Sequence, residues 1–288
     1  MYTSGDTFAR STGVNTHPSL LEVDQVTVIY RHGRRTRDAL GLRDVSLSVG
    51  HAETVGLVGE SGSGKTTLGR AVLGQLQVTS GRIIYDGADI THANRRTRGA
   101  LAREIQVVFQ DPYSSLNPSR TVGQSVAESL ITDSSLSKSE AARRVAETLE
   151  RVGMPADAAS RYPSQFSGGQ RQRIAIARAI VCQPRLVICD EPVSGLDLSV
   201  QAQVLNLLLD LQCKSGLSLL FIGHDLAVVR HLSHRIAVMH AGEIVEEGPA
   251  ERVYERPAHP YTQQLLAAVL TSDPEAQRAS HEAGSAIR

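Results

Sequence analysis

The sequence of 288 residues lacks an excess of charge of either sign, because its 30 basic and 30 acidic side chains cancel. Without such an excess, neither nucleic acid nor an acidic lipid surface is favoured as the main partner. Arginines do cluster within residues 31–37 and 95–98. We interpret these clusters as solvated loop charge, with contact to a phosphate or to a partner as the alternative.

Cysteine and long apolar runs are also scarce. Cys182, Cys189 and Cys213 form an odd set without metal-ligand spacing, which suggests neither a zinc site nor a disulfide framework. We expect all three to be buried small hydrophobic side chains in a reducing cytoplasm. No apolar run approaches the ~20 residues of a membrane helix, and residues 1–18 lack the apolar region of a signal peptide and predict a mobile tail. Any membrane role must then come through another chain.

What the sequence does have is a glycine-rich loop between an apolar strand pattern, residues 55–58, and a helical pattern from Leu68. The loop matches G-x-x-x-x-G-K-[ST], whose backbone N–H groups converge on an anion at the positive end of the helix. Lys65 should reach the outer phosphates, and the Thr66 hydroxyl should hold Mg²⁺. The loop predicts a magnesium nucleoside triphosphate, with a chance glycine turn as the alternative. The residues expected around the phosphates are Gly59, Glu60, Ser61, Gly62, Ser63, Gly64, Lys65, Thr66 and Thr67.

The remaining patterns predict a mixed α/β architecture. Residues 20–30, 39–49 and 81–85 read as strands of antiparallel hairpins, and they surround a parallel core. A helical block at about residues 111–180 interrupts the α/β pattern and predicts an inserted subdomain. Within it we expect Ser139 to begin one helix.

A second anion site is suggested where Ser167, Gly168, Gly169 and Gln170 open a helix. Ser167 is a natural N-cap, and the glycines leave backbone N–H groups accessible. The tetrapeptide alone is a weak signal, and a linker is the alternative.

Two adjacent carboxylates end the apolar strand at residues 186–189. Because side chains alternate along a strand, Asp190 and Glu191 should face different directions. Asp190 suits the Mg²⁺ shell, and Glu191 is placed to polarise a water that attacks the γ-phosphate; an exposed acidic turn is the alternative. His224 follows another buried strand, at the sheet edge where ligands bind, although a lone histidine is more often structural or solvated.

In this order and spacing, the motifs resemble the nucleotide-binding subunit of an ATP-binding cassette (ABC) transporter over about residues 20–270. Four segments resemble the dipeptide and oligopeptide importer subfamily: FQDPYSSLNP at 109–118, CDEPVSGLDL at 189–198, residues 200–208, and HPYTQQLL at 259–266. The last is the most discriminating. The resemblance implies a P-loop NTPase core of the RecA type, with an antiparallel β subdomain and an inserted α-helical subdomain.

The resemblance also implies roles for single residues. Residues 59–67 would be the Walker A loop, and Asp190 with Glu191 would be Walker B and the catalytic base. Gln110 would be a ligand of Mg²⁺ and water that senses the transport domain, and His224 the switch histidine. Three further contacts with nucleotide are implied. Ser167 to Gln170 would be the signature motif, which contacts the γ-phosphate bound to the opposite subunit. Asp197 would belong to the D-loop, and Tyr30 would stack on adenine.

Three departures from the family pattern stand out. Gly195 replaces the usual alanine of the D-loop, and Gly223 replaces the serine or threonine that precedes the switch histidine. Neither change removes a catalytic atom, so activity should survive. The C-terminal region has no cysteine, so we expect no iron–sulfur cluster there.

The resemblance implies an ATPase that energises import of di- or oligopeptides, or of a related small solute. It would work as a homodimer or with a sister ATPase, on the cytoplasmic face of the membrane, with two permease subunits and indirectly a solute-binding protein. The alternatives are an accessory ATPase of carbon–phosphorus lyase and, less favoured, a cassette acting on ribosomes or nucleic acid. We divide the chain into a tail (1–18), a nucleotide-binding domain (19–255) and a C-terminal extension (256–288), disordered after about 273.

Overall fold

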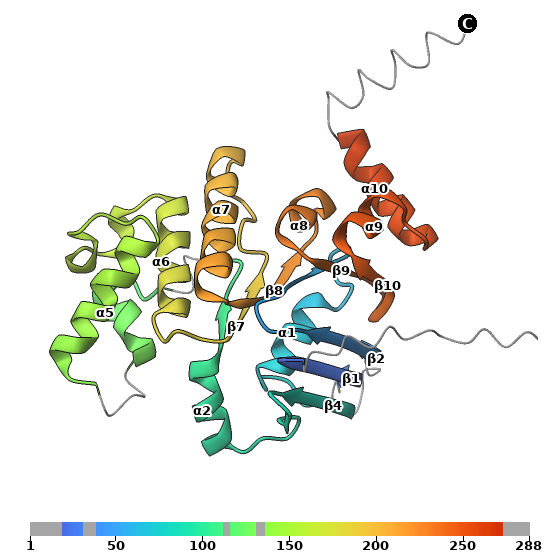
Figure 1. The fold of residues 1–288 in the computed structure, drawn as a ribbon, viewed down its shortest axis with the longest axis horizontal. Helices are drawn as coiled ribbons and strands as arrows, with labels where there is room; N and C mark the ends of the chain where they lie inside the picture. The colour runs from blue at the N-terminus through green and yellow to red at the C-terminus, as the bar shows by residue number, and fades with distance from the viewer. Residues whose placement is uncertain (1–18, 31–38, 112–115, 131–135, 273–288) are drawn as a thin grey trace, which may run out of the picture.

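The protein is represented by a computed structural model that describes residues 19–30, 39–111, 116–130 and 136–272, the last four by their backbone alone. Two β-sheets and a group of helices beside them make up the fold (Figure 1). None of the helices in these ranges has the length and apolar character needed to cross a membrane. The predicted tail at 1–18 and the predicted disorder after 273 lie outside the described residues.

The first sheet is antiparallel and has four strands in the order β2-β1-β4-β5. The strands are β1 (Leu21–Tyr30), β2 (Ala39–Val49), β4 (Ser80–Tyr85) and β5 (Ala88–Asp89). Their buried side chains, such as Val23, Leu42 and Ile83, line one apolar core. The predicted strand ranges agree with this sheet to within one residue.

The second sheet is the parallel core, in the order β10-β9-β3-β8-β7-β6. Its strands are β3 (Thr54–Val58), β6 (Ile105–Val108), β7 (Leu186–Asp190), β8 (Ser218–Gly223), β9 (Arg235–His240) and the antiparallel edge strand β10 (Glu243–Pro249). Every residue of β3 and β8 is buried, as expected for central strands covered on both faces. The carboxyl ends of β3, β7 and β8 therefore meet at one edge of the sheet.

Six of the described helices pack around this core or extend from it (Figure 1). They are α1 (Lys65–Val72), α2 (Arg95–Glu104), α7 (Leu198–Ser215), α8 (Leu226–Leu232), α9 (Ala250–Glu255) and α10 (Pro260–Ser272). Leu68 and Val72 of α1 join the core shared by the two sheets. Leu208 of α7 and Val229 of α8 belong to a second core on the other face of the parallel sheet.

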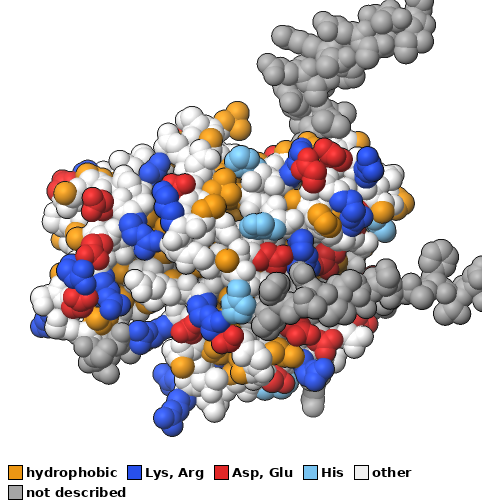
Figure 2. All heavy atoms as spheres, in the orientation of Figure 1, with side chains coloured by type: hydrophobic (Ala, Val, Ile, Leu, Met, Phe, Trp, Pro, Cys, Tyr) orange, Lys and Arg blue, Asp and Glu red, His pale blue; other side chains and the backbone are white. Residues whose placement is uncertain are grey.

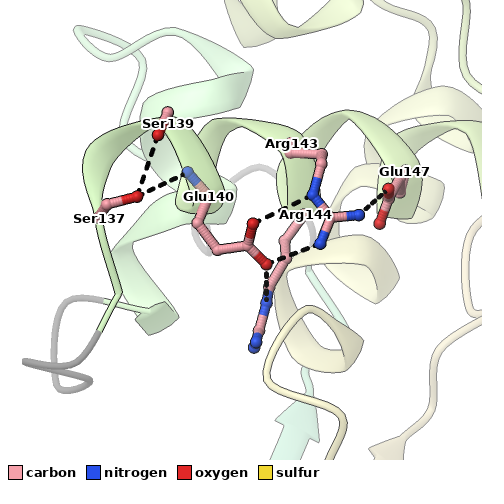
Figure 3. Close-up of polar contacts among 6 residues, drawn as sticks. All are labelled: Ser137, Ser139, Glu140, Arg143, Arg144 and Glu147. Atoms are coloured by element: carbon pink, nitrogen blue, oxygen red, sulfur yellow. Dashed lines mark hydrogen bonds and ion pairs between the residues drawn. The ribbon is translucent and has the colours of Figure 1, made fainter.

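The helical block lies between β6 and β7 in the chain and to one side of the core in Figure 1. It contains α4 (Val122–Ala127), η1 (Glu128–Leu130), α5 (Lys138–Arg151), η2 (Ala158–Ser160), η3 (Pro163–Gln165) and α6 (Gly168–Ile180). The expected start of α5 at Ser139 is wrong, because the Ser137 hydroxyl accepts the N–H of Glu140 at 3.2 Å and caps the helix. Figure 3 shows Ser139 bonded to Ser137, and Arg143 between Glu140 and Glu147 on the outer surface.

Two other expectations need correction. Residues 95–98 are not a loop but the first turn of α2, and Arg98 donates to the carbonyls of Val72 (2.9 Å) and Ile90 (2.6 Å). Among the cysteines, Cys189 is buried but Cys213 is exposed on α7. Residues 31–37 lie outside the described part of the chain. Elsewhere basic and acidic side chains are interspersed, as Figure 2 shows for one face.

Candidate nucleotide-binding site

The glycine-rich loop joins β3 to α1, as predicted. Its first residue, Gly59, has to be glycine because the backbone of Met239 lies very close to it. A Cβ atom on Gly59 would lie 2.1 Å from the carbonyl oxygen of Met239. At the other end Gly64 has φ 112° and is the N-cap of α1, without a side chain to occupy the first N–H groups of the helix. These groups are therefore free to face an anion, at the positive end of the helix dipole.

Lys65 is folded over the loop, with only 4% of the residue exposed. Its ammonium donates to the carbonyls of Gly59 (2.7 Å) and Glu60 (2.8 Å) and to the hydroxyl of Ser63 (3.4 Å). Burial lowers the pKa of Lys65, and the nearby carboxylates, first Glu191, partly offset that effect. A desolvated ammonium bonded to neutral oxygens is well placed to bind an anion.

Thr66 and Asp190 form the next part of the site. The Thr66 hydroxyl donates to a carboxylate oxygen of Asp190 at 3.1 Å, which joins the start of α1 to the end of β7. Burial raises the pKa of Asp190, and the hydrogen bond from Thr66 acts in the opposite direction. A hydroxyl beside a carboxylate is a donor set that suits Mg²⁺, which usually takes one or two protein ligands and completes its shell with phosphates and water.

Glu191 lies one residue beyond Asp190 and belongs to a different set of contacts. Its carboxylate accepts a hydrogen bond from the Gln110 side-chain amide at 3.2 Å and lies 3.6 Å from Nδ1 of His224. The backbone of Glu191 has φ 48°, in the left-handed region that favours glycine. After this turn Glu191 lines a pocket whose other lining residues include Ser194 and His224. The structure thus brings together Gln110, Glu191 and His224.

The two glycine departures lie beside this pocket. Gly195 has φ 73°, and a Cβ atom there would meet no heavy atom within 4 Å. At Gly223 a Cβ atom would come within 2.8 Å of a methyl group of Val229. Packing against α8 therefore explains why this chain has glycine before His224.

Ser167 to Gln170 lie apart from this group of residues. Ser167 and Gln170 form a capping box: the Gln170 N–H donates to the Ser167 hydroxyl, and the Gln170 amide oxygen accepts from the Ser167 N–H at 3.0 Å. Gly168 and Gly169 open α6, which Figure 1 places to one side of α1. The predicted site therefore divides into two parts within one chain.

Asp197 and Tyr30 occupy the periphery. Asp197 caps α7 by accepting the N–H of Val200 (3.0 Å) and the hydroxyl of Ser199 (2.7 Å); these bonds, chiefly the one from Ser199, lower its pKa. The Tyr30 hydroxyl shares a hydrogen bond of 2.9 Å with the Thr67 hydroxyl, so its ring stands beside the loop.

One contact was missed by sequence reasoning. The hydroxyl of Tyr261 accepts the backbone N–H of Glu60 at 3.0 Å, across a separation of 201 residues. Tyr261 lies in the HPYTQQLL segment, which the sequence marks only by its family resemblance. No local pattern could have placed that segment against the loop.

Comparisons with known proteins agree with this geometry. Residues 42–194 match the ABC transporter family, and residues 245–287 match the C-terminal region of oligopeptide/dipeptide transporters. The glutathione import ATP-binding proteins GsiA of Escherichia coli K12 and of Shigella boydii serotype 4 are each 51% identical over 85% of this chain. The chain spans 39% of the length of these relatives.

Solved structures give the same fold. The ATP-binding cassette MJ0796, in a dimeric post-hydrolysis state with ADP and Pi, superposes with a TM-score of 0.72 at 28% identity, over 80% of this chain and 98% of that one. The cbiO1 protein of Clostridium perfringens gives 0.74 at 28% identity, over 83% and 92% of the two chains. The predicted P-loop core and the predicted likeness to peptide importers are both confirmed. With its glycine loop and this fold, and with a family match over more than half of its length, the chain belongs to the ABC transporter family.

Proposed function

We propose that this chain binds ATP with Mg²⁺ and hydrolyses it. The observation that carries the proposal is the meeting of three groups at one edge of the parallel sheet: the loop with Lys65, the Thr66–Asp190 pair, and Glu191 with its neighbours. Each group matches one requirement of phosphoryl transfer, namely charge neutralisation, cation binding and orientation of the attacking water.

The loop and Lys65 bind and orient the triphosphate. The free N–H groups at the start of α1 point toward the phosphates, and the ammonium keeps its short bond to the Gly59 carbonyl while it exchanges its long bond to the Ser63 hydroxyl for an outer phosphate oxygen. Tyr30 stacks on the adenine, since its ring stands beside the loop at Thr67. Thr66, Asp190 and Gln110 hold Mg²⁺, which neutralises charge on the phosphates when it is bound.

Glu191 orients the attacking water and accepts its proton. The bond from Gln110 and the nearby imidazole of His224 hold the carboxylate in one direction, so a water bonded to it is aimed at a fixed point. The side chain of Glu191 is 20% exposed, which leaves room for that water. The base and the cation ligand are thus separate carboxylates.

We propose further that the site is completed by a second cassette, either another copy of this chain or a sister ATPase. Ser167 to Gln170, with the help of Asp197 at the interface, serve the nucleotide of the partner. Two observations support this: α6 stands apart from the loop of its own chain, and the MJ0796 cassette was solved as a dimer.

The transported solute is proposed from the relatives. The C-terminal match to oligopeptide/dipeptide transporters and the similarity to the glutathione import proteins support import of small peptides of the glutathione type. The chain would act as a peripheral subunit at the cytoplasmic face of the membrane, bound to two permease subunits that receive solute from a binding protein. Deleting the gene should abolish uptake of radiolabelled glutathione or dipeptides, and a complementing copy should restore it. Unchanged uptake of all of these peptides would exclude this substrate class.

The experiment for the ATPase is Glu191→Gln, which keeps the size and the amide contact but removes the base. We expect ATP binding to change by less than about twofold while turnover falls by roughly 10²- to 10⁴-fold, the usual contribution of a general base. The matched control is Glu243→Gln, at an exposed carboxylate paired with Arg43 on the edge strand. Equilibrium ATP binding and phosphate release measure the two quantities. Full turnover in Glu191→Gln would remove Glu191 from this role.

A further inference from the structure

The first turn of α10 is hydrogen-bonded to one peptide unit of the phosphate-binding loop. That unit joins Gly59 to Glu60. Its carbonyl accepts the ammonium of Lys65 at 2.7 Å, and its N–H donates to the hydroxyl of Tyr261 at 3.0 Å. Because the carbonyl and the N–H of a trans peptide point in opposite directions, Lys65 and Tyr261 bind opposite edges of this peptide and together fix its orientation.

Tyr261 is itself held firmly in place. It is 8% exposed, and its ring packs on His240 at the end of β9, with 4.0 Å between the ring centroids. His240 follows Met239, whose carbonyl is in close contact with Gly59. The ring is thus anchored to the same strand end that contacts the loop.

The turn before α10 is fixed by a buried carboxylate. Glu246 of β10, with 4% of its side chain exposed, accepts the backbone N–H groups of Ala258 (2.9 Å) and His259 (3.0 Å). The His259 imidazole in turn accepts the N–H of Tyr261 at 3.1 Å. Two layers of hydrogen bonds therefore set the position of the Tyr261 hydroxyl.

We propose that Tyr261 is a positioning residue for nucleotide binding: its hydroxyl fixes the Gly59–Glu60 peptide, and through that peptide the Lys65 ammonium, so that docking of the C-terminal segment and binding of ATP are coupled. A hydrogen bond to the N–H also polarises the carbonyl on the other side of the peptide, which strengthens its bond to Lys65. Coupling of this kind is reciprocal, so ATP must stabilise the docked segment to the same extent as the segment strengthens ATP binding. The inference rests on the proposed ATPase function.

The test begins with Tyr261→Phe, which removes the hydroxyl and keeps the ring on His240. Loss of one such hydrogen bond should raise both the Kd and the KM for ATP about fivefold and change kcat by less than about twofold. Without nucleotide, hydrogen exchange at the Glu60 amide should become faster. The matched control is Tyr254→Phe in the neighbouring helix α9, whose ring lies under Arg230; it should change none of these quantities.

A second variant replaces the Glu60 backbone amide with an ester, which removes the N–H donor, keeps the shape of the loop and leaves Tyr261 intact. In this background Tyr261→Phe should have no further effect on the Kd. If Tyr261→Phe leaves the Kd and the exchange of the Glu60 amide unchanged while the wild-type chain binds ATP, the inference is overturned. A further loss of affinity when Tyr261→Phe is added to the ester variant would also overturn it, because Tyr261 would then act by another route. A wild-type chain that does not bind ATP would refute the proposed function itself and this inference with it.

Discussion

The strained backbone at Glu191 predicts that this position exchanges stability for activity. Glu191 has φ 48° at the end of β7. The left-handed conformation costs a residue with a side chain roughly 1–2 kcal/mol, and strain of this kind is often retained at functional sites. Glu191→Gly should relieve the strain, while Glu191→Gln should keep it.

The size of the effect follows from two opposing contributions. Relief of roughly 1–2 kcal/mol is offset by the extra freedom of glycine in the unfolded chain, about 0.5–1 kcal/mol. The hydrogen bond lost from Gln110 is exposed, so its contribution is small. We therefore expect Glu191→Gly to have an unfolding free energy about 0.5–1 kcal/mol above that of Glu191→Gln, or roughly 2 °C in Tm.

The assay is reversible urea unfolding, combined with phosphate release. Both variants should be inactive, but the glycine variant should be the more stable. The matched control is Gln25→Gly, at a residue with φ 49° in β1, which should gain similar stability and keep its activity. If Glu191→Gly is no more stable than Glu191→Gln, while Gln25→Gly is stabilised, strain at Glu191 is refuted.

Two further predictions concern packing and pH. Gly223→Ser would restore the usual residue before the switch histidine, but its Cβ atom would crowd Val229 at 2.8 Å, so the unfolding free energy should fall by about 1–3 kcal/mol; unchanged urea unfolding would contradict this. Burial acts to raise the pKa of Glu246, but the N–H groups of Ala258 and His259 outweigh it and leave the pKa below 4.5. A carboxylate whose pKa is lowered in the folded state stabilises the protein at pH values above its unfolded-state pKa, and this stabilisation is lost in acid. The difference in unfolding free energy between wild type and Glu246→Gln should therefore be full above about pH 5 and shrink as the pH falls below 4.5. A gap that stays constant or widens in acid, in unfolding measured from about pH 3 to 8, would contradict it.

The sequence was most informative where structure depends on near neighbours. The strand at Ala39–Val49 was predicted to the residue, since its alternating pattern is local. The cap at Ser167 and the stop of α7 at Gly216, which has φ 63°, follow from side-chain and backbone preferences within one helical turn. The glycine loop and its helix belong to the same class of local signals.

What could not be predicted depends on contacts between distant segments. Arginines in a polar stretch suggested a loop, yet Arg98 reaches the carbonyl of Val72 in α1 and that of Ile90 just after β5, and it is partly buried. Cys213 occupies an exposed face of α7, and the bare sequence does not say which face of that helix meets solvent. The bond from Glu60 to Tyr261 spans 201 residues and depends on how β9, β10 and α10 pack together.

The two neighbouring carboxylates show how the backbone divides the proposed chemistry. Alternation along β7 was enough to predict that Asp190 and Glu191 diverge, but not what turns the second one. Asp190 ends the strand, is bonded to Thr66, and has a pKa raised by burial, a cost that a bound cation would remove. Glu191 leaves the strand through a left-handed turn and meets Gln110 and His224 instead. The strained backbone of Glu191 thus gives the proposed base contacts that differ from those of the proposed cation ligand, and the same turn leads into the segment before α7 that we assign to the partner cassette.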